Sequence, residues 1–226
     1  MLEFRNVTAA IGIIEILRDL NFRIEPAETL ALIGRNGAGK TTLLRTIMGF
    51  TRVRGDILFD SKPLTSVAPP KRPALGIGYS PEDRRLFSAF TVEENILLPA
   101  DAARLGAAET KRRLDRVYDI LPELKEMAGR PAGNVSGGQG KMVALARALM
   151  LGTKLVMLDE PFQGLAPALA LRYADALRAL RDSDRSITLI ITESNPSLLR
   201  GFASRTLVIE RGEVGEGSLD PERKSA

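Results

Sequence analysis

The segment from Gly34 to Thr41 reads Gly-Arg-Asn-Gly-Ala-Gly-Lys-Thr and matches the pattern G-x-x-x-x-G-K-[ST]. The apolar residues 29–33 before it predict a buried strand, and residues 42–48 after it predict a helix. Glycines let backbone N–H groups turn toward phosphate oxygens, and the start of the helix adds positive charge. A simple tight turn does not require the final Lys-Thr. We therefore predict a nucleoside-triphosphate site formed by Gly34, Arg35, Asn36, Gly37, Ala38, Gly39, Lys40, Thr41 and Thr42.

Lys40 and Thr41 carry the side chains suited to a phosphate chain and its metal ion. The Lys40 ammonium is predicted to reach the β- and γ-phosphates, and the Thr41 hydroxyl is predicted to ligate Mg²⁺. ATP and Mg²⁺ are therefore the expected ligands.

Composition excludes several other classes of protein. The chain has 226 residues, of which 44% are hydrophobic and 27% charged, as in a globular domain. No apolar run approaches the roughly 18 residues that cross a bilayer, and the N-terminus does not resemble a secretory signal. The absence of Cys agrees with a reducing compartment, so a cytoplasmic location is the expectation.

The net charge of +4 is modest, and the basic residues are scattered along the chain. Short groups at Lys71-Arg72, Arg84-Arg85 and residues 111–113 are interpreted as solvated surface. A nucleic-acid-binding domain usually gathers its basic residues on one face, so no nucleic-acid partner is expected. Attraction to an anionic membrane surface stays open.

Hydrophobic periodicity predicts strands that alternate with helices, which favours an α/β fold with a largely parallel sheet. The Pro-rich residues 61–73 are expected to form a surface loop. The segment from about 83 to 152 is predicted to be a helical insertion into the sheet domain. The expected strands are 2–7, 13–17, 22–24, 29–33, 56–59, 154–158, 187–192 and 206–210, and the expected helices are 92–98, 109–121, 138–150 and 167–180.

Asp159 and Glu160 follow the apolar residues 155–158. In α/β sheets, ligands bind at the carboxyl ends of the strands, where these two acids are expected to lie. Asp159 is predicted to hold the hydrated Mg²⁺, and Glu160 is predicted to polarise an attacking water. A strand that merely ends in acids is the alternative, and the phosphate-binding pattern earlier in the chain argues against it.

A second candidate for a phosphate-facing helix start is Ser136-Gly137-Gly138-Gln139, which precedes an apolar helical segment. Ser136 is a good N-cap residue, so an ordinary capped helix is one interpretation. The other is a helix N-terminus that faces an anion.

The order of these three motifs resembles that of the ATP-binding cassette (ABC) ATPase family over essentially the whole chain. The resemblance implies a P-loop fold with a RecA-like, mostly parallel core and an N-terminal antiparallel β subdomain. It implies a nucleotide-binding core over 1–82 and 153–226 and a helical signature subdomain over 83–152. Family members bind two ATP molecules between two head-to-tail cassettes, so Ser136 and Gly138 are implied to act on the partner's nucleotide.

Three further segments, 79–87, 91–95 and 164–167, resemble the shorter ATPase subunit of branched-chain amino acid and amide uptake systems. That resemblance implies a bacterial importer whose ATP-driven dimerisation powers transport. Its implied partners are a second cassette, identical or different, transmembrane permease subunits and, indirectly, a substrate-binding protein. The implied location is peripheral, at the cytoplasmic face of the inner membrane.

The chain departs from the family pattern at three positions. It contains no His, and Ser194 stands where most members place a His that contacts the γ-phosphate. Glu82 stands where the coupling loop usually has Gln, which would add negative charge near Mg²⁺. Ile11 stands where an aromatic residue usually stacks on adenine, and core packing is an equal alternative for it. Ser194 and Ile11 together suggest that this chain's own site hydrolyses slowly.

Other function classes are disfavoured. Ribosome-acting ABC proteins typically have two cassettes in one chain, and DNA-repair members carry long coiled coils between their motifs. A regulatory subunit with little hydrolysis is supported by the missing His and opposed by Glu160. A GTPase is disfavoured because no Asn-Lys-x-Asp motif follows residue 41.

Overall fold

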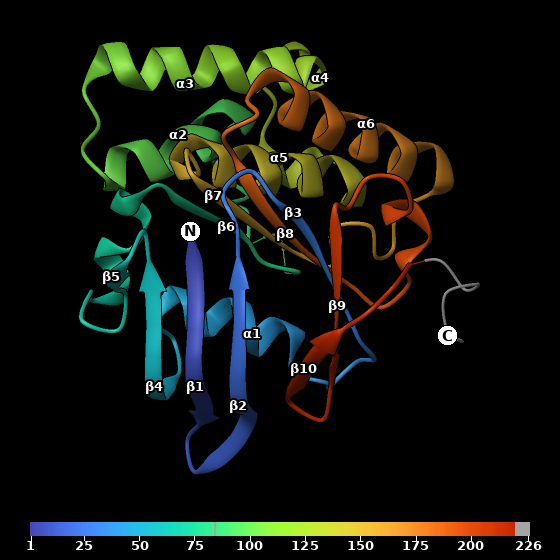
Figure 1. Ribbon diagram of the computed structural model, residues 1–226. Helices are drawn as coiled ribbons and strands as arrows, with labels where there is room; N and C mark the ends of the chain where they lie inside the picture. Colours follow the sequence, from blue (N-terminus) through green and yellow to red (C-terminus); the bar gives the residue numbers. More distant parts are fainter. Residues whose placement is uncertain (84, 220–226) are drawn as a thin grey trace. The chain divides into compact units, whose positions relative to one another are not determined.

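The computed structural model describes residues 1–83 and 85–219 (Figure 1). The chain forms two compact units, the first from Met1–Leu75 with the segment from Thr188 onward, and the second from Gly76–Ile187. The division into a nucleotide-binding core and a helical signature subdomain, with boundaries at residues 83 and 152, stays a prediction. Residues 84 and 220–226, which it includes, lie outside the described ranges.

The first unit contains an antiparallel sheet in the order β2-β1-β4-β5. Its strands are β1 (Leu2–Ile11), β2 (Ile14–Ile24), β4 (Arg52–Phe59) and β5 (Lys62–Pro63). The buried residues of β1 are Leu2, Phe4, Val7 and Ala9, which alternate with more exposed residues except at the irregular stretch between Phe4 and Val7. The helix α1 (Lys40–Met48) contacts β2 and β4 and lies behind this sheet in Figure 1. Its buried Leu43, Leu44 and Ile47 supply the apolar face.

β2 is one continuous strand, although the sequence predicted two short strands at 13–17 and 22–24. The polar residues between them form an irregular stretch of the β1–β2 ladder, where Asn6 and Asp19 have positive φ angles of 51° and 43°. The Asn21 side chain accepts a hydrogen bond from the Asn6 backbone N–H at 2.8 Å. The polar residues therefore form a bulge rather than a break.

β3 (Thr29–Ile33) is the central parallel strand of the first unit. It pairs in parallel with β8 (Thr188–Glu193) on one side and with β9 (Arg205–Glu210) on the other. The polar edge strand β10 (Glu213–Glu216), which the sequence did not predict, pairs antiparallel with β9. The carboxyl ends of β3 and β8 thus lie at the same edge.

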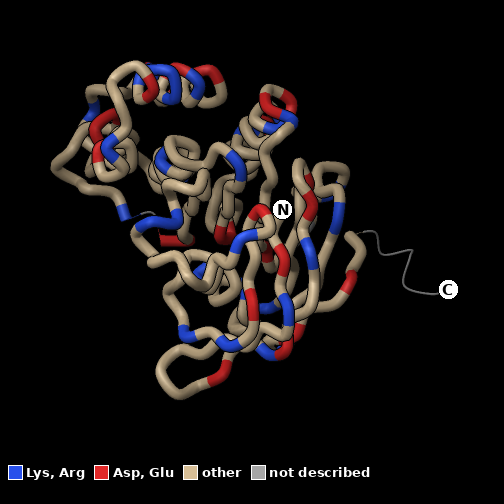
Figure 2. Tube along the Cα trace, turned by 60° about the vertical axis from the view of Figure 1, so that its left-hand side comes forward, with Lys and Arg blue, Asp and Glu red and all other residues tan. Residues whose placement is uncertain are grey.

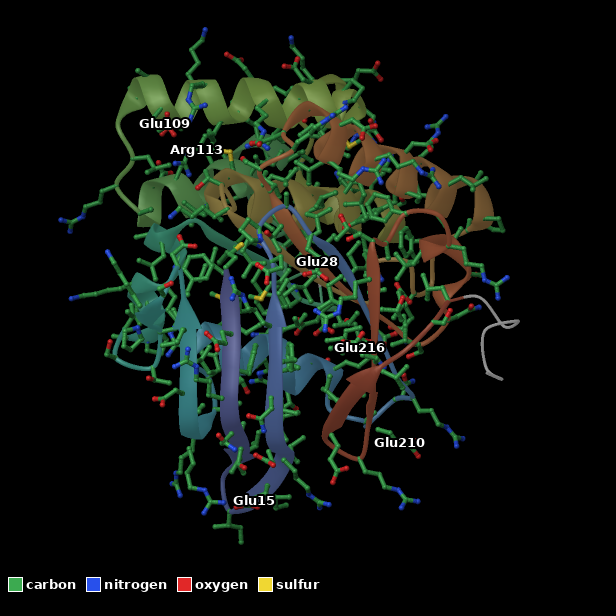
Figure 3. All side chains as sticks on the ribbon, in the orientation of Figure 1. Glu15, Glu28, Glu109, Arg113, Glu210 and Glu216 are labelled. Carbon is green, nitrogen blue, oxygen red and sulfur yellow. The ribbon has the colours of Figure 1, made fainter. Side chains whose placement is uncertain are left out.

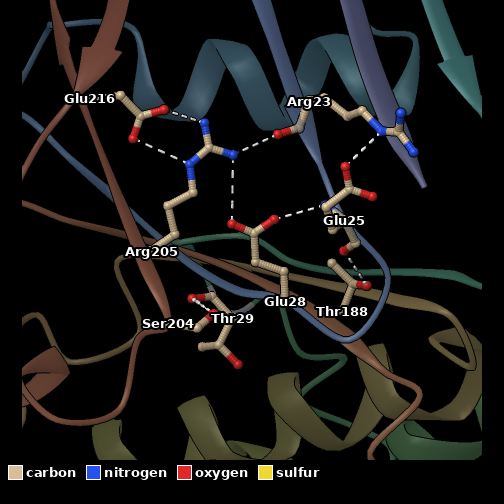
Figure 4. A network of polar contacts seen from close by, with 8 residues as sticks. All are labelled: Arg23, Glu25, Glu28, Thr29, Thr188, Ser204, Arg205 and Glu216. Atoms are coloured by element: carbon tan, nitrogen blue, oxygen red, sulfur yellow. Dashed lines mark hydrogen bonds and ion pairs between the residues drawn. The ribbon is translucent and has the colours of Figure 1, made fainter.

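The opposite end of β3 is fixed by a network of charged groups, drawn in Figure 4. The Arg205 guanidinium forms ion pairs with Glu216 and Glu28, and it donates to the Arg23 carbonyl at 2.7 Å. A Glu28 carboxylate oxygen accepts from the Glu25 backbone N–H at 2.7 Å. This network joins β2, β9, β10 and the turn before β3.

The second unit combines a parallel strand pair with helices. β6 (Ile77–Ser80) pairs with β7 (Leu155–Asp159). The sequence missed β6, which is short and contains Gly78. A Cβ atom at Gly78 would lie 2.1 Å from the Ala148 carbonyl oxygen, so glycine allows the close approach of a helix to β6. The helices are α2 (Val92–Ala102), α3 (Ala107–Ile120), α4 (Pro122–Glu126), α5 (Gly137–Leu151) and α6 (Pro167–Ser183).

Charged side chains link α3 to α5. Figure 3 shows Glu109 and Arg113 together near the start of α3. Arg113 donates to Glu109 at 2.6 Å and to the Met150 carbonyl, in the last turn of α5, at 2.7 Å. Hydrogen bonds from Arg112 and Arg113 lower the pKa of Glu109 to about 2. A cation at the carboxyl end of α5 also complements its helix dipole.

The interpretation of Lys71-Arg72 as solvated surface is wrong for Arg72, which is only 5% exposed. Its guanidinium donates to the carbonyls of Thr46 and Ile47 at 3.0 and 2.6 Å, and to Val67 at 2.9 Å. These bonds satisfy carbonyls in the last turn of α1, and burial lowers the Arg72 pKa. Short 3₁₀ turns occur nearby at Pro69–Lys71 and Pro73–Leu75, and elsewhere at Ala132–Asn134 and Pro196–Leu199.

Figure 2 shows acidic and basic residues interspersed along the traces of both units. This agrees with the scattered charge predicted from the sequence. Among the described helices, none is both long enough and apolar enough to cross a membrane.

Candidate functional site

The loop between β3 and α1 has the backbone conformation that its glycines permit. Gly37 and Gly39 have φ angles of 81° and 117°, a region that other residues rarely adopt. Gly39 is the N-cap of α1 and offers no side chain to accept a hydrogen bond from the first helical turn. The first turn of α1 is therefore bordered by glycine backbone, which suits a phosphate ligand.

Gly34 and Gly39 also allow this loop to pack closely on its surroundings. A Cβ atom at Gly34 would lie 2.5 Å from the Ile209 carbonyl oxygen, and one at Gly39 would lie 2.9 Å from a Leu17 methyl carbon. Gly212, in the turn between β9 and β10, donates its N–H to the Ala38 carbonyl at 3.0 Å. Sequence reasoning missed Gly212, whose only signal was a glycine shortly after a predicted strand.

Lys40 and Ser194 come together at the carboxyl ends of β3 and β8. The Lys40 Nζ donates to the Gly34 carbonyl at 2.6 Å, to the Arg35 carbonyl at 3.2 Å and to Ser194 Oγ at 3.0 Å. Ser194 Oγ in turn donates to the Asn36 side-chain oxygen at 2.7 Å. The ammonium is buried, and the Ser194 residue is exposed.

The parallel register explains this meeting of residues far apart in the sequence. Ile33 pairs with Glu193, so the next residues, Gly34 and Ser194, leave the sheet side by side. The Gly34 backbone N–H donates to the Glu193 carbonyl at 3.3 Å. The position of Ser194 beside the glycine-rich loop is therefore fixed by strand pairing.

Thr41, Thr42 and Ile11 are the remaining candidates in the first unit. Thr41 is half-buried in the first turn of α1, and Thr42 is buried behind it. Ile11 is 47% exposed at the end of β1, so the core-packing alternative for this residue is wrong. Its apolar side chain is instead available to a ligand or to solvent.

Asp159 and Glu160 lie at the carboxyl end of β7 in the second unit, and both are at least 95% buried. The Tyr79 hydroxyl, on the neighbouring strand β6, donates to an Asp159 carboxylate oxygen at 3.3 Å. Tyr79 was not predicted as a site residue, although it lies in a segment that resembles the uptake family. The buried acids have the oxygen ligands that Mg²⁺ prefers.

Glu160 has an unusual backbone conformation for a residue that is not glycine. Its φ angle is +46°, which costs of the order of 1–2 kcal/mol. The Lys141 Nζ, from the second turn of α5, donates to the Glu160 carbonyl oxygen at 2.8 Å. Sequence reasoning missed this contact because Lys141 and Glu160 lie on separate elements.

Ser136 is the N-cap of α5, which agrees with one of the two interpretations of this segment. Its hydroxyl accepts from the Gln139 backbone N–H at 3.2 Å, and the Gln139 side-chain oxygen accepts from the Ser136 backbone N–H at 2.9 Å. These two bonds form a capping box. A Cβ atom at Gly138 would collide with the Leu169 side chain of α6.

Glu82 is exposed and lines a cavity of about 620 Å³ within the second unit. The start of α5, the loop after β6 and the loop before α6 all contribute to this cavity. In the described part of the chain, no group of three or more His, Cys, Asp or Glu residues could hold a metal ion by itself. The cavity is lined by Glu82, Asp83, Arg85, Leu86, Ala132, Val135, Gly140, Lys141, Gln163 and Gly164.

Known sequences agree with the motif order. The sequence pattern of the ABC transporter family matches residues 17–163, more than half of the chain. The high-affinity branched-chain amino acid transport ATP-binding protein BraG of Pseudomonas aeruginosa is 34% identical, over 95% of this chain and 91% of its own. The probable branched-chain amino acid transport ATP-binding protein LivF of Archaeoglobus fulgidus is also 34% identical, over 95% and 90%.

Solved structures share the fold. A dimeric bacterial ABC transporter cassette superimposes with a TM-score of 0.84 and 24% identity, covering 97% of this chain and 99% of the other. The α/β class and the cassette fold predicted from the sequence are thereby confirmed.

Proposed function

Because this chain belongs to the ABC transporter family, we propose that it is the ATP-hydrolysing subunit of an importer for branched-chain amino acids or related amides. The observation that carries ATP binding is the glycine loop at 34–41, where Lys40 is buried beside Ser194 and the first turn of α1 is uncapped by a side chain. The names of the two relatives support the transport of branched-chain amino acids.

The first unit supplies the groups that bind the triphosphate. The backbone of residues 34–39 and the start of α1 offer N–H donors to phosphate oxygens. Lys40 exchanges its hydrogen bonds to the Gly34 and Arg35 carbonyls for bonds to the β- and γ-phosphates. Ile11, exposed at the end of β1, gives the adenine an apolar contact without stacking.

Thr41 and Asp159 fit a magnesium ion by their chemistry, since a hydroxyl and a carboxylate are hard oxygen donors. The lack of a cluster of three acidic or metal-binding side chains among the described residues fits an ion that takes its other ligands from phosphate and water. When bound, Mg²⁺ neutralises charge on the phosphate oxygens. Tyr79 keeps the Asp159 carboxylate in one orientation.

Glu160 is the proposed general base that polarises the attacking water. Phosphoryl transfer requires positioning and charge neutralisation rather than covalent catalysis by the protein. The Glu160 residue is only 5% exposed, so its carboxylate can act in a site from which bulk water is largely excluded.

Ser136 and Gly138 are proposed to contact the nucleotide of a second cassette, identical or different. The dimeric cassette of similar fold supports this arrangement. The capping box keeps the start of α5 folded before a partner arrives, so little ordering is needed on closure. ATP binding then closes the two cassettes, and hydrolysis reopens them.

The loop after β6 is proposed to transmit this movement to the permease subunits. Phe87 and Phe90 are 53% and 41% exposed and stack on each other with ring centroids 5.6 Å apart. Asn95 holds the loop on α2 through bonds to the backbone N–H and carbonyl of Phe87. Glu82 lines the cavity beside this loop. The chain would then be peripheral at the cytoplasmic face of the inner membrane, with a substrate-binding protein on the other side.

Reconstitution tests this function directly. The complete complex, purified with its permease subunits and placed in liposomes, should take up labelled leucine only with its binding protein and with ATP. Urea and acetamide, tested with the same preparation, distinguish amides from amino acids. Absence of permease subunits from the purified complex would contradict the importer function, and co-purification with ribosomes would support a non-transport ABC ATPase.

A slow site in this chain is a narrower proposal, supported by Ser194 and Ile11. A serine hydroxyl is shorter than an imidazole and carries no charge, so it gives less help to the γ-phosphate. In a complex of two different cassettes, Glu160→Gln here should reduce ATP hydrolysis less than the equivalent change in the partner. Equal losses would contradict it. Single-turnover hydrolysis by the purified chain tests the alternative, a regulatory subunit with negligible activity.

A further inference from the structure

The contact between Lys141 and Glu160 joins two proposed functional elements inside the second unit. Lys141 lies in α5, three residues after Gly138, and Glu160 follows β7. The Lys141 Nζ donates to the Glu160 carbonyl oxygen at 2.8 Å. A hydrogen bond from an ammonium group is stronger than one between neutral groups.

This bond holds a residue, Glu160, whose backbone conformation is unfavourable for a residue with a side chain. The φ angle of Glu160 is +46°, so the residue depends on its surroundings to stay in the left-handed region. The carbonyl that Lys141 holds belongs to the peptide group directly after Glu160. Fixing that peptide group limits the rotation of the Glu160 backbone and therefore the direction of its side chain.

The other end of the link is the start of α5. The capping box of Ser136 and Gln139 makes the first turn a single folded piece, and Lys141 extends from the following turn. A displacement of Ser136 and Gly138 therefore carries Lys141 with it. A rigid helical turn transmits such a shift without unfolding.

We propose that Lys141 is a positioning residue. Through it, the direction of the Glu160 carboxylate depends on the position of the signature end of α5, that is, residues 136–139. The inference rests on the proposed function, in which Ser136 and Gly138 contact the partner's nucleotide and Glu160 serves this chain's own site. When Ser136 and Gly138 contact the partner's nucleotide, Lys141 then sets the direction of Glu160 at this chain's own nucleotide.

The test compares Lys141→Met, which keeps the apolar stem and removes the donor, with Lys141→Arg, which keeps a cationic donor. Lys111→Met is the matched control, since Lys111 lies on α3 of the same unit with its side chain 80% exposed. The kcat and KM for ATP are measured on the assembled complex, together with the melting temperature of each purified chain.

Lys141→Met should lower kcat about tenfold while KM and the melting temperature change little, because a charged hydrogen bond that aligns the base is lost. Lys141→Arg should restore kcat to within about threefold of the wild type. An unchanged kcat would overturn the proposal. A parallel loss of melting temperature and of both kinetic constants would also overturn it, because that result indicates a structural support.

A double-mutant cycle tests the dependence on α5. If Lys141 carries the influence of the signature end, the loss in kcat for Ser136→Ala with Lys141→Met should be smaller than the product of the two single losses. Multiplicative losses would overturn the coupling. Wild-type complex that neither binds nor hydrolyses ATP would instead refute the proposed function, so the two failures are distinguishable.

Discussion

Helices α1 and α5 both begin at a glycine-containing segment, but their first turns are treated differently. Gly39 at the start of α1 is in a left-handed conformation and has no side chain, whereas Ser136 at the start of α5 is extended and forms a capping box with Gln139. At the start of α5 the chain itself supplies an acceptor for the Gln139 N–H, whereas no side chain caps the first turn of α1, which suits an outside acceptor. We therefore expect changes at the start of α1 to affect nucleotide binding by the isolated chain, and changes at the start of α5 to affect mainly its stability and the paired cassettes.

Lys40→Ala should have the largest effect. Loss of the ammonium removes charged hydrogen bonds to phosphate, and the affinity of the isolated chain for a fluorescent ATP analogue should fall about a hundredfold. Lys71→Ala, an exposed change in the same unit, is the control. Ser136→Ala should leave this affinity within about twofold. Equal losses at Lys40 and Ser136 would refute the difference between the two helix starts.

Gly39→Ala should lower the free energy of unfolding by about 2 kcal/mol, since its φ angle is +117° and the new Cβ atom would approach Leu17. Gly138→Ala should cost less, because the Leu169 methyl group that it meets lies at the end of a flexible side chain. Thermal unfolding of both variants, with Gly215→Ala as a control in open space, measures the difference. A larger loss at Gly138 would show that the start of α5 is the more constrained.

Ser136→Ala should reduce the free energy of unfolding by about 1 kcal/mol because the capping box is broken. The melting temperature should fall by about 2–4 °C for a chain of this size. Ser136→Thr, which keeps the hydroxyl, should retain most of the stability. Equal melting temperatures for the alanine and threonine variants would show that the hydroxyl does not stabilise α5.

Ile11→Tyr should have the smallest effect, a gain in ATP-analogue affinity of a few fold. An aromatic ring that stacks on adenine contributes about 0.5–1.5 kcal/mol beyond the burial of its area. Ile13→Tyr is the matched control, because Ile13 is 96% exposed between β1 and β2. Equal gains at the two positions would indicate non-specific contact rather than an adenine site.

Much of the fold was predictable because its signals are local. The run before Gly34, the pattern to Thr41 and the capping residue Ser136 each act over a few residues, so their elements followed from the sequence. β6, β10 and α4 were missed because they are short, polar or interrupted by Gly and Pro. The buried Arg72 was missed because a charged residue in a Pro-rich segment ordinarily faces water.

The sequence alone determined the glycine loop with Lys40, the two acids at the carboxyl end of β7 and the capped start of α5. These features depend on the conformations and charges of neighbouring residues, which sequence order preserves. Only the tertiary structure decided that Ser194 meets Lys40 and Asn36, because the parallel register of β3 and β8 brings residues 154 positions apart into contact. It likewise decided that Lys141 holds the Glu160 carbonyl, since that bond depends on how α5 packs beside β7.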